Sequence, residues 1–257
     1  MLSRSHRYDT LHASHRGPVL WIALHRPHAG NRVNRRMVTE LGELAQTANL
    51  DESVRVVVLT GHGRWFSAGG EVPRVSSPDK LGAFQAAGAV ARIEKPMVAA
   101  INGDALGQGL EVALAADLRV AAQTARFGLP QVREGLLPWD GGTQRLPRLV
   151  GRAQALRLLL LGETIDAAEA QRIGLVHRLA APEALVATAE EMARGIASAA
   201  PVAARYAKEA VRQGLDLSLA QGLRLEADLA LLLHTTRDRA EGIRSFLERR
   251  QPRFRGR

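Results

Sequence analysis

The sequence contains no cysteine, so disulfide bonds and thiolate metal sites are excluded. This absence fits a reducing compartment, and we expect a cytoplasmic protein. The apolar runs, among them Val56–Leu59 and Leu158–Leu161, are far too short to cross a bilayer. No apolar run follows the basic residues near the start of the chain, so neither a membrane span nor a secretory signal is predicted.

Aromatic residues and lysine are scarce. Aromatics make up 4% of the chain and are scattered, so no aromatic platform for single-stranded nucleic acid is visible. Lysine occurs only at Lys80, Lys95 and Lys208, so the net charge of +9 is carried almost wholly by arginine. Such a surface either attracts phosphate groups or is simply solvated. The basic residues are densest at the end of the chain, at Arg249, Arg250, Arg253, Arg255 and Arg257.

The histidines show no metal-binding spacing, and no phosphate-binding loop or dinucleotide fingerprint is found. We therefore expect neither a metal ion nor a redox cofactor.

The composition and the hydrophobic patterns predict one α/β core followed by helices. Apolar residues make up 46% of the 257 residues, which is an ordinary globular composition. The hydrophobic patterns predict strands at Val19–His25, Arg55–Thr60, Pro96–Ile101 and Leu118–Ala122, and helices at Arg36–Asn49 and Gln108–Ala116. After Arg152 the chain reads as almost wholly helical. Helices are predicted to start at Asp166, at Pro182 (running through Ala200) and at Pro201, and two more follow, one ending at His234 and one over Arg237–Arg250. The predicted division is a core at 1–197 and a helical region at 198–257.

Two glycine-rich turns follow predicted strands. The first, Arg64–Val72, contains three successive small residues that let a ligand approach the backbone. In the second, Ile101–Asp117, glycines flank Gln108 where a helix starts, and free N–H groups at such a start favour negative charge. Glu111 follows three residues later. Taken singly, such turns are usually ordinary loops, and a glutamate in a first helical turn is usually a surface residue.

Together the two turns suit proton transfer next to a thioester. Removing the weakly acidic Cα proton of a CoA thioester puts charge on the thioester oxygen. Two N–H donors aimed at that oxygen can each contribute about 3–4 kcal/mol. A carboxylate near Cα or Cβ can then carry the proton.

The same turns carry a family resemblance. Phe66–Glu71 resembles the F-x-A-G-x-D turn of the crotonase superfamily, and Asn102–Glu111 resembles that family's N-G-x-A-x-G-x-G-x-E segment. Further matches occur at Phe127–Pro130, Gly141–Leu146, Gly151–Ala153 and Ala168–Val176. The resemblance to these enoyl-CoA hydratases and isomerases runs from about Val19 to Phe254.

The resemblance implies an α/β fold of the ClpP/crotonase type. It would be a spiral of ββα units with a helical C-terminal region for trimerisation, assembled as a homotrimer or a dimer of trimers. The expected activity is acyl-CoA processing of the enoyl-CoA hydratase or isomerase type, as a lyase or an isomerase. No cofactor is expected beyond the coenzyme A of the substrate.

The resemblance also implies roles for the residues of this sequence that match the family's motifs. The oxyanion hole would use the N–H groups of Gly70 and Gln108, and Glu111 would be the acid/base. The family often has glycine at the second of these positions, and Gln108 keeps the N–H. The second hydratase glutamate falls at Gln131, which cannot exchange a proton and can only hold a water or a carbonyl. Glu134 or Asp140 could substitute for it, and Glu134, three residues past Gln131, shares a face with it if the segment is helical. The alternative interpretations are a solvated surface residue for Glu134 and a turn residue for Asp140.

The coenzyme A contacts implied by the resemblance form three groups. They are the turn Ala29, Gly30, Asn31 and Arg32; the backbone of Ala68, Glu71 and Val72; and Phe246 with Arg249, reaching a neighbouring subunit's coenzyme A.

Two alternatives remain open. Asp140 motivates other chemistry in the same oxyanion hole: thioester hydrolysis, C–C cleavage or decarboxylation. The basic charge motivates a weakly catalytic RNA-binding relative, although nucleic acid is the less favoured partner.

Overall fold

The computed structural model describes residues 8–72 and 77–257, and a six-stranded sheet lies at its centre. The strands lie in the order β1-β2-β3-β4-β6-β9, with β1 and β2 antiparallel and all other neighbours parallel. Their bounds are β1 Leu11–Arg16, β2 Val19–Leu24, β3 Val56–Gly61, β4 Met97–Ile101, β6 Leu118–Ala122 and β9 Arg178–Ala180. Because parallel neighbours need crossover connections, helices cover both faces of the sheet.

Alternate residues of β2 enter two different apolar cores. Leu20 and Ile22 belong to the larger core, which α1, α2, α3 and α4 cover. Val19 and Trp21 belong to the smaller core on the other face, which α6 covers. The helices are α1 Arg35–Leu50, α2 Ala86–Ala91, α3 Gln108–Leu114, α4 Gly142–Leu161, α5 Ala167–Arg172 and α6 Leu185–Ala197. Burial on both faces explains why the strands read as continuous apolar runs.

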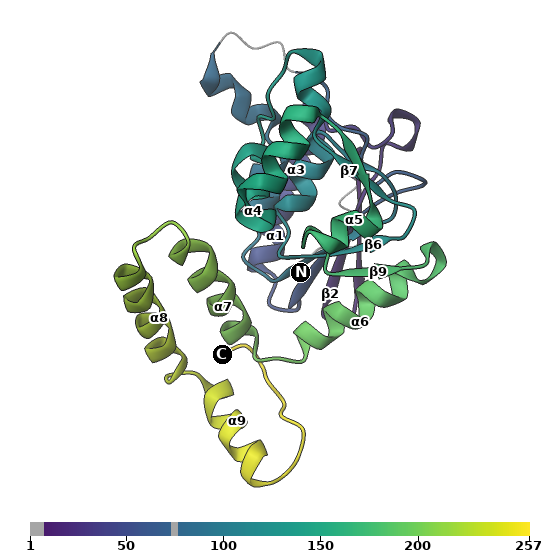
Figure 1. The fold of residues 1–257 in the computed structure, drawn as a ribbon. Helices are drawn as coiled ribbons and strands as arrows, with labels where there is room; N and C mark the ends of the chain where they lie inside the picture. The colour runs from purple at the N-terminus through teal and green to yellow at the C-terminus, as the bar shows by residue number, and fades with distance from the viewer. Residues whose placement is uncertain (1–7, 73–76) are drawn as a thin grey trace.

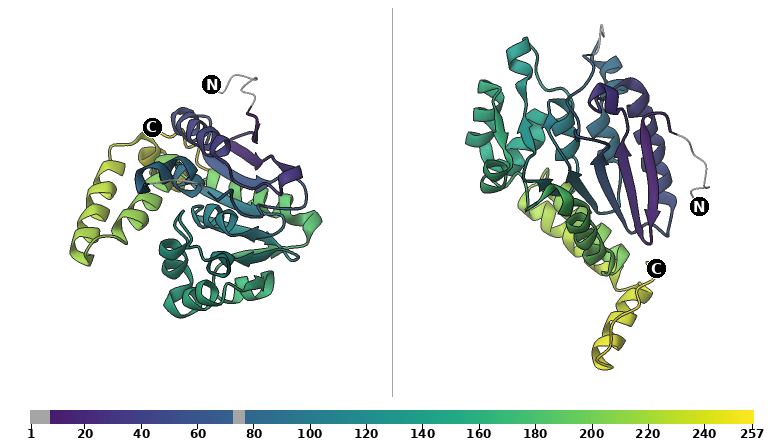
Figure 2. Two further views of the ribbon diagram at one scale, coloured as in Figure 1. Left: turned by 90° about the horizontal axis from the view of Figure 1, so that it is seen from above. Right: turned by 90° about the vertical axis from the view of Figure 1, so that its right-hand side faces the viewer.

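A small second sheet and a helical extension complete the chain. The second sheet has the order β5-β7-β8, from Ala105–Leu106, Arg126–Gly128 and Thr164–Asp166. The last helices are α7 Pro201–Gly214, α8 Leu219–Leu233 and α9 Arg237–Leu247. They project from the body of the molecule, and α9 lies at the end opposite α3 (Figures 1 and 2).

Most predicted elements are confirmed to within a residue or two: β2, β3, β4, β6, α1 and α3. Asp166 also caps its helix as predicted, accepting a hydrogen bond from Glu169 N at 2.8 Å. The expectation of an almost wholly helical chain after Arg152 is wrong for β8 and β9. These strands have three residues each, too few to show a period, and pairing with β7 and β6 stabilises them.

Three helix limits in the C-terminal part also differ from the prediction. Pro182 opens a short 3-10 turn, η4 (Pro182–Ala184), before α6, which ends at Ala197 rather than Ala200. The last helix, α9, ends at Leu247 rather than Arg250. In the described part of the chain, no helix is both long and apolar enough to cross a membrane.

Candidate active site

The two glycine-rich turns meet at the carboxyl edge of β3 and β4, where Asn102 joins them. Asn102 Oδ1 accepts from Gly61 N at 2.9 Å, and its Nδ2 donates to Gly63 O at 2.7 Å. Ser67 of the first turn pairs with Ala105 of the second as an isolated parallel bridge. The carboxyl ends of two adjacent parallel strands therefore hold the two turns side by side.

Glycine allows the turns to touch. A Cβ on Gly109 would lie 2.4 Å from Ser67 O, well inside van der Waals contact. Gly107, just before α3, has φ 51° and ψ −126°, a conformation that L side chains rarely adopt. A Cβ there would lie 3.7 Å from Gly69 Cα. The glycine spacing seen in the sequence is thus the condition for close packing of the two turns.

Two backbone N–H groups are free at this junction. Val33 N donates to Gly69 O at 2.9 Å and Glu71 N donates to Val33 O at 2.8 Å, so the N–H of Gly70 between them points the other way. Gln108 is the first residue of α3, where N–H groups have no partner within the helix. Among the described residues neither N–H donates a hydrogen bond. Both N–H groups are thus available to an acceptor oxygen of a ligand, which is what the expected oxyanion hole requires.

Glu111 is completely buried, which excludes the interpretation as a surface residue at a helix start. Its Oε1 accepts from Asp140 N and Gly142 N, both at 2.8 Å. Burial raises the pKa of the carboxyl from 4.5 to about 7, against the opposing effect of these two N–H groups. Glu111 can therefore gain or lose a proton near neutral pH, as an acid/base residue must.

Gln131 lies beside Glu111, where the family has its second glutamate. Its Nε2 is 3.4 Å from Glu111 Oε2, a long contact. The side chain is buried, and its Oε1 has no partner in the part of the chain that the structure describes. An unpartnered buried acceptor next to a carboxylate is suited to holding a water.

Asp140 lies at the site, where its carboxylate accepts hydrogen bonds from neighbouring groups. Its Oδ2 accepts from Ala87 N at 2.7 Å and Gln108 Nε2 at 2.9 Å, and its Oδ1 accepts from Gly88 N at 3.1 Å. Burial raises the pKa of this carboxyl, and the bond from Gln108 is the strongest opposing effect. The carboxylate thus holds the first turn of α2 in place.

Glu134 is not brought to the site. It ends the short 3-10 helix η3 (Pro130–Glu134) and is exposed, whereas Gln131 in the same helix is buried. Although the two residues are three positions apart in one short helix, only Gln131 is buried.

The turn proposed for coenzyme A lies against the first donor turn. Ala68 N donates to Gly30 O at 2.8 Å, and a Cβ on Gly30 would lie 3.0 Å from Ala68 Cβ. Buried Asn31 holds the turn through its side chain, which donates to Trp65 O at 2.8 Å. The structure thus brings Ala29–Arg32 together with Ala68–Val72, the segment that contains Gly70.

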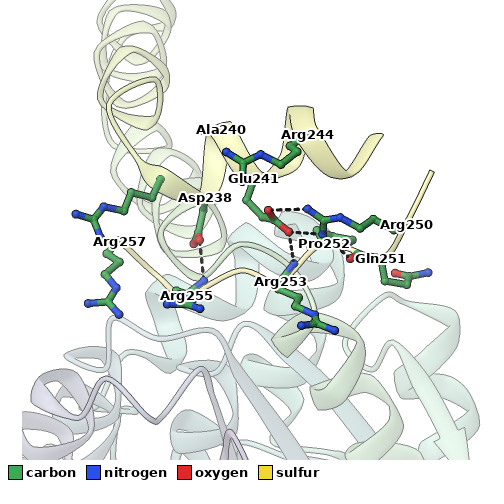
Figure 3. Close-up of a pocket in the computed structure, with 11 residues that line it drawn as sticks. Asp238, Ala240, Glu241, Arg244, Arg250, Gln251, Pro252, Arg253, Arg255 and Arg257 are labelled. Atoms are coloured by element: carbon green, nitrogen blue, oxygen red, sulfur yellow. Dashed lines mark hydrogen bonds and ion pairs between the residues drawn. The ribbon is translucent and has the colours of Figure 1, made fainter. Parts of the chain in front are cut away.

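Phe246 and Arg249 do not reach this surface within one chain. They lie at the end of α9, far from α3 (Figure 1), and Phe246 is 82% exposed. Next to them is a hollow of about 830 Å³ lined mainly by arginines (Figure 3). There Glu241 pairs with Arg250 at 2.6 Å, and Asp238 accepts from Arg255 N at 2.7 Å. The C-terminal tail is therefore held against α9.

The sequence did not predict two features of the site. Arg145 Nη1 donates to Asp140 O at 2.7 Å and supports the turn that binds Glu111; its motif was recognised but its contact was not. Gln108 acts through its side chain as well as its N–H, since its Nε2 binds Asp140. Only the departure from glycine at position 108 could have signalled this. Among the described residues, no group of three or more His, Asp or Glu is placed to hold a metal ion.

Comparisons with known proteins agree with this geometry. The family model for enoyl-CoA hydratase/isomerase matches residues 15–257. A probable enoyl-CoA hydratase of Mycobacterium leprae is 40% identical over 253 residues, covering 96% of this chain and 98% of that protein. The 2,3-dehydroadipyl-CoA hydratase of Escherichia coli is 39% identical over 244 residues, covering 93% and 96%.

Solved structures give the same result. The crystal structure of an enoyl-CoA hydratase from Bacillus anthracis superposes with a TM-score of 0.92 at 34% identity, covering 97% of this chain and 100% of that chain. With a spiral core, two adjoining donor turns and a buried glutamate, the chain has the crotonase fold and belongs to the enoyl-CoA hydratase/isomerase family.

Proposed function

We propose that this protein adds water reversibly to the double bond of an enoyl-CoA thioester, with Glu111 as its one proton carrier. The observation that carries the proposal is the position of Glu111, buried with a pKa of about 7, one helical turn beyond the oxyanion donor Gln108. Relatives across nearly the full length are named as hydratases.

The hydrogen bonds of Glu111 give its two carboxylate oxygens different roles. Two N–H groups hold Oε1, so Oε2 is the atom left to move a proton. Ionised Oε2 takes a proton from water while the water oxygen attacks Cβ, and Gln131 Oε1 accepts a hydrogen bond from the O–H that the water keeps. Charge moves to the thioester oxygen, where the N–H groups of Gly70 and Gln108 stabilise it. Oε2 then returns the proton to Cα, so all atoms of the water enter the product.

Double-bond isomerisation is the second candidate, and Gln131 favours it. A hydratase with two carboxylates can share the base and acid roles, whereas an amide exchanges no proton. Isomerisation needs one carrier that removes a proton and returns it elsewhere on the acyl group, which Glu111 alone provides. Hydrolysis through Asp140 is less well supported, because three N–H groups already bind that carboxylate.

Coenzyme A would lie along Ala29–Arg32 and the backbone of Ala68–Val72, leading the thioester to Gly70. Phe246 and Arg249 would contribute from a second copy. The proposed assembly is a homotrimer or a pair of trimers, which the many exposed apolar side chains on the last helices support. These include Val211, Leu215, Leu219, Leu223, Leu231, Phe246 and Leu247. Sedimentation velocity of the full chain tests it, and a monomer would contradict it.

Product analysis tests the activity. The protein is incubated with crotonyl-CoA and with longer and cyclic enoyl-CoAs, and the mass of each product is measured by mass spectrometry. A gain of one water with loss of the conjugated enoyl absorbance supports hydration, and a moved double bond at unchanged mass supports isomerisation. Release of free coenzyme A would support hydrolysis instead. Wild-type turnover by Glu111→Gln would refute both leading mechanisms.

A further inference from the structure

The side chain of Gln108 is buried, with 1% of its surface exposed, and is tied at its amide nitrogen. Nε2 donates to Asp140 Oδ2 at 2.9 Å and also to Phe84 O, at the end of the 3-10 helix η2 (Pro78–Phe84). Within the described residues Oε1 has no hydrogen-bond partner. The side chain therefore spans from the oxyanion hole to the η2–α2 segment and to the turn before α4.

Gln108 and Gly70 fit each other. A Cβ on Gly70 would lie 2.0 Å from Gln108 Oε1 and 3.2 Å from Gln108 Cβ. No side chain at position 70 is compatible with the observed position of Gln108. The amide of Gln108 fills the space that a side chain of the first oxyanion residue would otherwise occupy.

This amide lies where an acyl group has to pass. A thioester oxygen held by Gly70 N and Gln108 N places the thioester carbon between the two residues. Glu111 must reach Cα and Cβ, so the acyl group starts along the inner side of α3. Carbons beyond Cβ that extend toward η2 and α2 then meet the anchored amide of Gln108.

A hollow lies behind this barrier. It has a volume of about 800 Å³ between α2, α4 and α7, and Gln85, Asp140 and Arg145 are among its lining residues. Gln108 and Glu111 do not line it. Asp140 therefore lines the hollow and also binds Gln108, so the side chain of Gln108 and the Asp140–Gly142 turn lie between the hollow and Glu111.

We propose that the Gln108 side chain is a specificity-determining partition, which restricts the enzyme to short enoyl-CoA thioesters and closes the site to longer acyl chains. The proposal rests on the hydratase or isomerase function proposed above. Removing the side chain would open the space between Gly70 and Phe84, on the side of the hollow, and admit additional methylene groups.

The test compares crotonyl-CoA with oct-2-enoyl-CoA for wild type and Gln108→Gly. The readout is the ratio of kcat/KM for the two substrates, so a general loss of activity in the variant cancels. We expect wild type to prefer crotonyl-CoA, and Gln108→Gly to shift the ratio toward oct-2-enoyl-CoA by at least about tenfold. Each methylene that gains an apolar contact contributes about a factor of four. Gln108→Ala, checked for folding by circular dichroism, serves as the second variant.

A pair of variants tests the fit to position 70. Gly70→Ala should lose most turnover while Gln108 is present, and Gly70→Ala combined with Gln108→Gly should recover it, because the methyl group then has room. An unchanged substrate ratio in folded, active Gln108 variants would overturn the inference alone, as would a wild type that prefers oct-2-enoyl-CoA. A wild type that converts no enoyl-CoA would overturn the proposed function and this inference with it.

Discussion

Replacing Glu111 with glutamine should remove activity and at the same time stabilise the fold. The amide oxygen introduced by Glu111→Gln could still accept from the N–H groups of Asp140 and Gly142, so the turn before α4 would keep its contacts. The amide cannot carry a proton, and loss of general acid–base catalysis costs about 10²–10⁴-fold in rate. We therefore expect kcat to fall by about a thousandfold.

The gain in stability follows from the raised pKa of Glu111. Burial raises this pKa from 4.5 to about 7, so between these values the folded protein keeps a proton that the unfolded chain has released. The wild type therefore loses stability as pH rises from about 4.5 to about 7, and above pH 7 the loss is constant at about 3 kcal/mol. Glu111→Gln does not titrate, so it should exceed wild type by about this amount at pH 8 and by little at pH 4.5.

Urea unfolding at several pH values, combined with the enoyl-CoA assay, measures both effects. Glu52→Gln is the matched control, since it makes the same chemical change at an exposed position. A pH-dependent gain seen in Glu111→Gln but absent from Glu52→Gln then comes from the buried position of Glu111. A stability difference for Glu111→Gln that does not vary between pH 4.5 and 8 would refute the electrostatic reasoning, and wild-type turnover would refute the catalytic role.

Three further predictions concern the surroundings of Glu111. Gln131→Glu would place a second carboxyl next to Glu111 Oε2. Because two adjacent carboxyls do not readily ionise together, the pair should share a proton near neutral pH. The rate of hydration should then rise at least about tenfold, as a pH–rate profile would show. A lower rate would contradict the proposed role of the amide. Asp140→Asn should keep kcat within about tenfold, whereas Asp140→Ala should lower the free energy of unfolding by about 2–4 kcal/mol because buried N–H groups of α2 lose their acceptor; a loss of a thousandfold in Asp140→Asn would make this carboxyl a proton carrier. Gly109→Ala should destabilise the fold by about 1–3 kcal/mol in thermal unfolding and reduce kcat, since its Cβ would lie 2.4 Å from Ser67 O; a wild-type melting temperature would show that the turns can separate without loss.

The sequence left undecided which carboxylate, if either, replaces the second glutamate of the family. The chain places glutamine where the family has glutamate, and two nearby carboxylates, Glu134 and Asp140, were the candidates to replace it. Helical spacing suggested that Glu134 lies with Gln131, but only one of the two is buried. Asp140 does reach the site, where its oxygens bind α2 and Gln108. No spacing rule distinguishes these outcomes, because both depend on how the Pro130–Gly142 segment packs against α3.

The sequence by itself determined the parts of the site that rest on local backbone chemistry. Glycines at fixed spacing after a strand predict turns with free N–H groups, and a glutamate one turn into the following helix predicts a carboxylate close to the second turn. Only the tertiary structure decided the state of these groups. The pKa of Glu111 depends on complete burial, and Asp140 meets Ala87 across 53 residues of sequence. The role of the Gln108 amide depends on its packing against Gly70 and its hydrogen bond to Phe84 O. Both residues lie near it only in the folded chain, where the sheet brings the two turns to one edge. Desolvation and long-range packing are properties of the folded molecule, whereas turn chemistry is a property of a few consecutive residues.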